Sequence, residues 1–274
     1  MRIKVKNLIL IEGLIDEDFE SQKVIPALAE NMFKNFIKQY VEKVFLLRGK
    51  PDRFMVNAFK GLKFKYGKLN NFVANFMLFL EFDDKIGVGG HFQHSPNSGY
   101  GTIALNVDPN TLYSVFLNSY KYGDADNNEI MESMYYALRS DDLISVLIHE
   151  TQHAYDYFIS EGKFITDKSS KEFYKDKKDQ TPKSDEKKSL MKVKYLRLKH
   201  EVNARFTQAI NDMPWIIHTN DSSRLITPTE YIDEFKGKFA GWDIMTPKIK
   251  KYLLRRASQY YYKFKDEYEN KKEE

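Results

Sequence analysis

Residues 140–160 read SDDLISVLIHETQHAYDYFIS and carry the clearest helical pattern in the chain. Ser140 or Asp141 can cap the first turn, where acidic residues also suit the positive end of the helix dipole. Apolar residues flank the central HETQH segment on several faces of the predicted helix, which is typical of a buried helix. We therefore expect this helix to lie in the core, with polar side chains that need partners.

The HETQH segment, residues 149–153, has the spacing of a metal-binding helix. His149 and His153 are four residues apart, so both imidazoles project from one helical face and can reach a single ion. Glu150 lies beside them and can take a proton from metal-bound water without being a ligand. The alternative is a core helix whose histidines have ordinary neighbours. We favour a divalent cation, because buried imidazoles and a buried carboxylate are costly without such a partner.

A third protein ligand must come from elsewhere, because catalytic zinc sites usually combine three protein ligands with water. Glu201 is our choice, since it lies in a predicted helix over 190–212 and small Ala204 follows one turn later. His200 is the alternative, and the two side chains point roughly 100° apart on a helix, so only one should face the metal. Asp156 is expected to accept a hydrogen bond from a metal-binding imidazole rather than to bind the metal.

The composition limits the kinds of function. The 274 residues include no cysteine, which excludes disulfides and cysteine metal sites and fits a reducing compartment. The formal net charge of +4 does not imply nucleic-acid binding, and the Lys-rich stretch 163–189 is nearly as acidic as it is basic. The N-terminus does not resemble a signal peptide, and no apolar run is long enough to span a membrane. We expect a cytoplasmic or otherwise intracellular protein without nucleic-acid or membrane partners, and the Lys, Asn, Phe and Tyr richness is in keeping with an AT-rich genome such as that of a phage.

Three parts of the chain are predicted: residues 1–160 with a helix, a sheet and the HETQH helix, a charged mobile insertion over 161–189, and a helical part over 190–274. Periodicity and turn residues predict the other elements. These are helices over 24–47 with Pro26 near the start, over 110–139 with a break near Gly123, and over about 247–268, and strands within 54–82, most clearly 72–82, and over 102–107.

The segment HETQHAYD, followed by a helix with Glu201 and Ala204, resembles the gluzincin branch of the zincin metallopeptidases. The HExxHAxD form is similar to lethal-factor-like peptidases, to proline-specific bacterial endopeptidases and to the mitochondrial metallopeptidase that processes an ATP synthase subunit. The resemblance covers about residues 86–212. It implies an α+β, zincin-like fold, with a small mixed sheet whose edge strand lies above the active-site helix and a mainly helical lower lobe. It also implies a zinc endopeptidase with one Zn²⁺ ion, Glu150 as general base and a protein or peptide substrate.

The resemblance further implies roles outside the metal ligands. An edge strand would pair with extended substrate, and the matching residues are Tyr100, Gly101, Thr102, Ile103 and Ala104. Lethal-factor-like enzymes place a tyrosine about two turns before the glutamate ligand as an oxyanion donor. Tyr195 precedes Glu201 by six residues, one short of that spacing. His218 is the alternative donor.

Other interpretations remain open at this point. An SprT-like protease of DNA-bound proteins would need His200 as third ligand and activity stimulated by DNA, and the balanced charge argues against it. A catalytically inactive zincin-fold structural or binding protein is the second alternative. His91 and His94 form an HxxH pair in a Gly-rich segment, for which we expect a loop or substrate-rim role rather than a second metal site.

Overall fold

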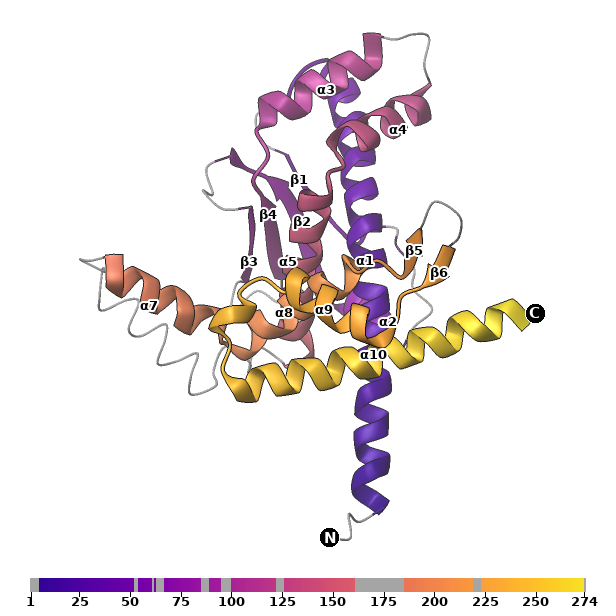
Figure 1. Ribbon diagram of the computed structural model, residues 1–274. Coiled ribbons are helices and arrows are strands. Elements are labelled where there is room, and N and C mark those ends of the chain that lie inside the picture. The colour runs from indigo at the N-terminus through magenta and orange to yellow at the C-terminus, as the bar shows by residue number, and fades with distance from the viewer. Residues whose placement is uncertain are drawn as a thin grey trace. The chain divides into compact units, whose positions relative to one another are not determined.

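The computed structural model describes residues 5–51, 54–60, 62, 67–84, 89–94, 100–121, 126–160, 185–218 and 223–273 (Figure 1). The chain divides into two compact units with separate hydrophobic cores. The sheet unit is Lys23–Ile165, and the helical unit is Met1–Gln22 together with Thr166–Glu274. Most of the predicted mobile insertion, residues 161–184, lies outside the described residues.

The sheet unit contains a four-stranded sheet with the strand order β1-β2-β4-β3. The two central strands, β2 and β4, are parallel, and each outer strand runs antiparallel to its neighbour. This mixed pairing confirms the predicted small mixed sheet. Together with the helices described next, it also confirms the α+β class. The strands are β1 (Met55–Asn57), β2 (Met77–Phe82), β3 (Gly90–His94) and β4 (Tyr100–Leu105).

β4 is not the edge strand that we expected. It pairs with β2 on one side along its whole length and with β3 on the other side from Gly101 to Leu105. The assignment of Tyr100, Gly101, Thr102, Ile103 and Ala104 to a substrate-pairing edge is therefore wrong. The Gly-rich segment before β4 contains a strand of its own, and this strand, β3, covers the outer side of β4.

Helices pack around this sheet in the described part of the chain, with aromatic side chains filling the core. On α1, Phe36 lies fully buried and its ring stacks on Phe82 of β2 with 4.1 Å between centroids. Large buried aromatic surfaces of this kind contribute most of the packing energy of a core. The helices are α1 (Val5–Leu47), α2 (Gly67–Asn75), α3 (Pro109–Lys121), α4 (Asn127–Leu138) and α5 (Asp141–Ile159).

Two predicted element boundaries are wrong and one is confirmed. α1 begins at Val5 rather than at residue 24, so Pro26 lies inside the helix instead of near its start. The strand predicted from Phe72 is helical up to Asn75, and the rings of Phe72 and Phe76 stack across one helical turn at 5.5 Å. The break expected near Gly123 is confirmed, since α3 ends before it and α4 begins after it.

Because Gly90 has no side chain, helix α5 can pack closely against strand β3. A Cβ atom on Gly90 of β3 would lie 2.7 Å from Cγ1 of Val146 on α5. Within the sheet, a Cβ atom on Gly101 would lie 2.4 Å from the ring of Phe92. Real Cβ atoms do not come that close to other carbon atoms, so both positions require glycine as the structure stands.

We expect Gly101→Ala to destabilise the protein by about 1–3 kcal/mol, because the added methyl group overpacks the space under the Phe92 ring. Urea denaturation monitored by circular dichroism measures this change. Gly237→Ala, in the exposed part of helix α9 (Pro228–Lys238), is the matched control, since nothing lies within 4 Å of its added Cβ. Equal unfolding midpoints for the two variants would contradict the close packing.

The helical unit has a core built on Phe206, Tyr231, Phe235 and Trp215. The Trp215 ring stacks on Phe264 with 3.7 Å between centroids, which ties the middle of the unit to its last helix. The elements are α7 (Asp185–Leu196), α8 (Lys199–Asn211), β5 (Ile216–His218), β6 (Ser223–Leu225), α9, a short 3₁₀ turn at Trp242–Ile244 and α10 (Pro247–Glu273).

The predicted single helix over 190–212 is two helices, α7 and α8, separated at Arg197 and Leu198. α7 also begins at Asp185, so residues 185–189 are helical rather than part of the predicted insertion. A residue later in the chain stabilises this break, because Arg197 Nε donates a hydrogen bond to the Ile244 carbonyl oxygen at 2.7 Å.

A second contact anchors α8 itself. The guanidinium group of Arg256, on α10, stacks on Phe206 at 4.1 Å and donates to Asn203 Oδ1 at 3.0 Å. Charge-assisted hydrogen bonds and cation–π contacts of this kind are strong when they are buried, and Arg256 is 9% exposed.

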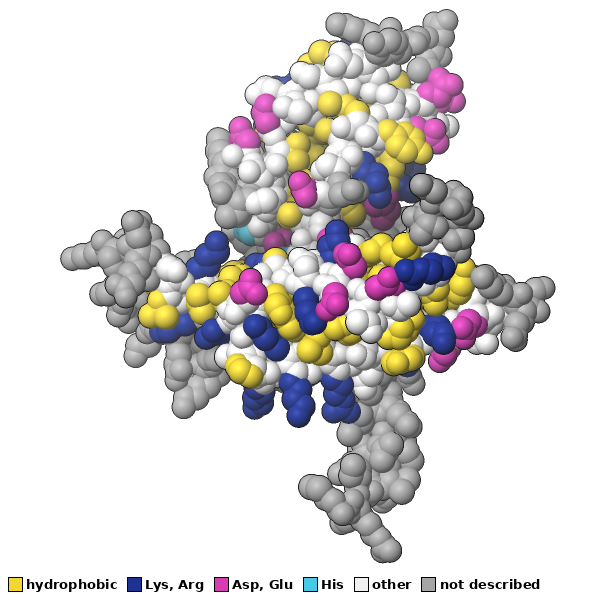
Figure 2. Space-filling model, viewed as in Figure 1, with side chains coloured by type: hydrophobic (Ala, Val, Ile, Leu, Met, Phe, Trp, Pro, Cys, Tyr) yellow, Lys and Arg dark blue, Asp and Glu magenta, His cyan; other side chains and the backbone are white. Residues whose placement is uncertain are grey.

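α10 is amphipathic. Leu253, Ala257 and Tyr261 are buried on its inner side, whereas Figure 2 shows basic side chains gathered along its outer side, where Lys251 and Arg255 are exposed. Across the described residues, every helix is either too short or too polar to cross a lipid bilayer.

Candidate metal centre

Local contacts fix the HETQH segment on α5. Ser140, one of the two predicted caps, accepts a hydrogen bond from the Leu143 backbone N–H at 3.1 Å and caps the helix. The Thr151 hydroxyl donates a hydrogen bond to the carbonyl oxygen of Leu147, one turn earlier, at 2.7 Å. Leu147 is fully buried in the core of the sheet unit. The predicted helix over 140–160 is therefore confirmed as α5, and its central turn is packed into the core of the sheet unit.

His149 and His153 point at each other across one turn of α5. Their Nε2 atoms are 3.1 Å apart, and their rings are nearly perpendicular at 88° with 4.6 Å between centroids. Two nitrogen ligands of a tetrahedral zinc ion, each about 2.05 Å from the metal, lie about 3.3 Å apart. The observed pair is close to that spacing. Without an ion the same separation is that of a hydrogen bond between the two ring nitrogens.

Glu201 lies in the first turn of α8 and is 1% exposed. A carboxylate in the first turn of a helix is stabilised by the helix dipole. Two basic side chains of the same helix lie near its oxygens: Arg205 Nε is 3.8 Å from Oε2, and His200 Nε2 is 3.9 Å from Oε1.

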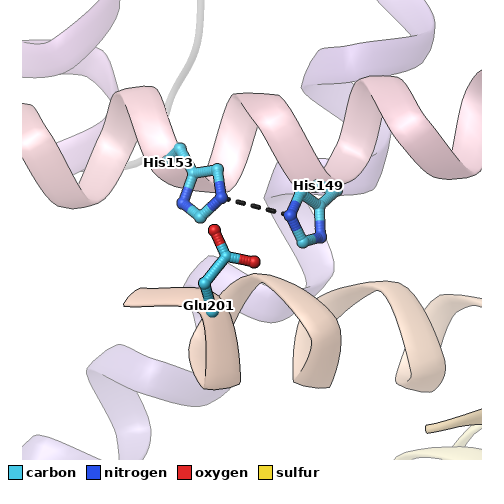
Figure 3. Close-up of side chains that lie close together, drawn as sticks. All are labelled: His149, His153 and Glu201. Carbon is cyan, nitrogen blue, oxygen red and sulfur yellow. Dashed lines mark hydrogen bonds between the residues drawn. The ribbon is translucent and has the colours of Figure 1, made fainter. Parts of the chain in front are cut away.

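The three predicted ligands form a cluster. One ligand atom each of His149, His153 and Glu201 lies within 4.8 Å of the other two, and the Glu201 carboxyl group points toward the imidazoles (Figure 3). Among the described residues, no other group of three or more His, Asp or Glu side chains is spaced in this way, and His200 does not belong to the cluster. Two imidazoles and one carboxylate are a donor set found at catalytic zinc ions, so the residues present fit this metal.

Glu150 and Asp156 lie on the same helix as the two histidines and are buried, with exposures of 6% and 8%. Asp156 accepts a hydrogen bond from the side-chain amide of Gln152 at 2.8 Å. Glu150 is outside the three-residue cluster, which suits a role as a base rather than a ligand. The predicted hydrogen bond from an imidazole to Asp156 stays a prediction.

The two predicted oxyanion donors lie in the helical unit. Tyr195 is on α7, not on the helix of Glu201, so the spacing of two turns within one helix does not apply to it. Its partly buried ring packs against the core of the helical unit. His218 ends β5, and its side chain lies outside the described residues. Both roles stay predictions.

His91 and His94 lie in strand β3 and not in a loop. Residues three apart in a strand project to opposite faces, so these two imidazoles cannot share one ion. The His94 ring stacks on Tyr157 of α5 with 4.4 Å between centroids. Burial lowers the pKa of His94 below its ordinary value, which favours the neutral imidazole.

The structure adds a feature that sequence patterns missed. Gly90, at the start of β3, lies against Val146 of α5, and His94, at its end, stacks on Tyr157. β3 therefore runs beside the part of α5 that carries His149 and His153. Among the described strands, β3 pairs only with β4, so its outer side is an edge of the sheet. In the sequence, two glycines and the turn-forming residues that follow β3 obscure the alternation of apolar and polar side chains that is typical of a strand.

No protein-family model matches the sequence, and no curated protein or solved structure is significantly similar to it.

Proposed function

We propose that this chain is a zinc-dependent endopeptidase whose metal ligands are His149, His153 and Glu201. One observation carries the proposal: two imidazole nitrogens 3.1 Å apart on a buried helix, with the Glu201 carboxyl group within 4.8 Å. Bringing three such groups together in a protein interior is costly, and a divalent cation offsets that cost.

A bound zinc ion supplies a Lewis acid for the scissile carbonyl and makes water more acidic. Glu150 is the proposed general base, which accepts a proton from the attacking water and passes it to the leaving amine. Its place directly after His149 keeps it next to the ligand pair without drawing it into the ligand set. Tyr195 and His218 are the candidate donors to the developing oxyanion.

The substrate-pairing edge in this proposal is β3, in place of the β4 residues that the sequence suggested. An extended peptide can add to an open strand edge through backbone hydrogen bonds, which suits cleavage of unfolded segments. The position of β3 beside α5, between Val146 and Tyr157, supports this assignment.

We expect the purified protein to contain about one zinc ion per chain, the stoichiometry of a single catalytic site. It should cleave a generic unfolded protein, lose that activity on chelation and regain it when zinc is added. Metal analysis by mass spectrometry and a gel-based cleavage assay measure both properties. Protein that contains no divalent ion, and that added zinc neither stabilises nor activates, would refute the proposal.

The same assay separates the alternatives. Stoichiometric zinc without cleavage of any unfolded protein would indicate a structural or binding role. Cleavage that requires DNA would indicate the SprT-like alternative, which also needs His200 as ligand. The cluster supports Glu201 rather than His200 in that position.

A further inference from the structure

Arg205 places a guanidinium group near the carboxylate of the proposed metal site. It lies four residues after Glu201 on α8, and its Nε is 3.8 Å from Glu201 Oε2. A glutamate four residues before an arginine is the favourable order for an ion pair on a helix. The Arg205 side chain is 20% exposed and that of Glu201 is 1% exposed, so water screens this pair poorly.

The Arg205 Nε atom is buried and has no hydrogen-bond partner among the described residues. A buried guanidinium N–H without an acceptor is unusual, because no hydrogen bond compensates for the loss of its contacts with water. At 3.8 Å from Glu201 Oε2 it lies somewhat beyond hydrogen-bond distance.

We propose that Arg205 is a positioning residue for metal binding, and the inference rests on the zinc site proposed above. Its guanidinium group holds one carboxylate oxygen of Glu201, which leaves the other oxygen directed to the ion. Partners of this kind orient metal ligands, and their removal weakens metal binding by about 10- to 100-fold. The opposing effect is repulsion between the guanidinium group and the dication, which alone would make zinc bind more tightly once Arg205 is removed. Weaker zinc binding after removal of Arg205 would therefore indicate positioning of Glu201, and tighter binding would indicate charge repulsion.

The test measures the zinc dissociation constant by competition with a chromophoric chelator. Arg205→Gln should bind zinc about 10- to 100-fold more weakly than the wild type, and Arg205→Lys, which keeps the charge, should recover part of the loss. Lys265→Gln is the matched control, because it removes a cation from an exposed pair with Glu269 that has the same four-residue spacing in the same unit. That control should bind zinc as the wild type does.

Two further measurements distinguish positioning from a merely structural role. The visible absorption of the cobalt(II)-loaded protein reports ligand geometry, and it should change in Arg205→Gln and return toward wild type in Arg205→Lys. The melting temperature of the metal-free protein should change little. Unchanged or tighter zinc binding in Arg205→Gln would overturn this inference but not the proposed function. The same holds if binding is weaker only because the metal-free protein is less stable and the cobalt spectrum is unchanged. Wild-type protein that binds no zinc would remove the proposed function and this inference with it.

Discussion

Glu150→Gln is expected to lower the turnover of peptide cleavage by about 10²- to 10⁴-fold, the range that a general base contributes. Glutamine has the shape of glutamate but cannot accept the proton of the attacking water at neutral pH. Since Glu150 lies outside the ligand cluster, the variant should still contain zinc. Initial rates of cleavage of an unfolded protein, measured with zinc content on the same samples, test both parts.

Glu132→Gln on α4 is the control for this variant, because it removes the same charge from an exposed position of the same unit. Its activity and zinc content should match those of the wild type. Wild-type turnover in Glu150→Gln would exclude Glu150 from the chemistry, whereas loss of zinc would indicate that it helps to bind the metal.

His153→Ala is expected to abolish stoichiometric zinc binding and with it the stabilisation that zinc gives to the folded protein. A ligand at about 1,000 times its dissociation constant stabilises the folded state by about 4 kcal/mol, provided that it does not bind the unfolded chain. The wild type should therefore melt at a higher temperature with zinc than with a chelator. In His153→Ala the two melting temperatures should coincide.

His91→Ala provides the comparison, since it removes an imidazole from β3 that lies outside the ligand cluster. It should keep both the zinc ion and the zinc-dependent rise in melting temperature. A zinc-dependent rise of the same size in His153→Ala would exclude His153 as a ligand.

The helix that carries the candidate site could be predicted because its signals are local. Ser140 caps it, apolar residues recur through it, and His149 and His153 follow at the spacing of one turn. Each of these acts within a few residues, so tertiary contacts did not alter the outcome. The sequence also favours Glu201 as the third ligand, and the structure brings its carboxyl group near both imidazoles. That zinc occupies this position stays a prediction.

Strand order could not be predicted in the same way, because it depends on pairing between segments distant in sequence. β3 follows a run of glycines, and its place outside β4 comes from the register that pairs Phe92 with Ile103 and His94 with Gly101. The break at Arg197 and Leu198 is another such case. The local sequence favours a continuous helix, whereas the bond from Arg197 to the Ile244 carbonyl oxygen joins residues 47 positions apart.

The anchoring of α8 has a consequence for how this protein can vary. Arg256 and Ile244, which hold Asn203 and Arg197, both come from elements that follow α8 in the chain. The place of Glu201 within the helical unit is thus held in part by residues that follow it in the chain. Removing α10 would therefore displace that carboxylate within its unit, although none of the proposed metal ligands lies in α10.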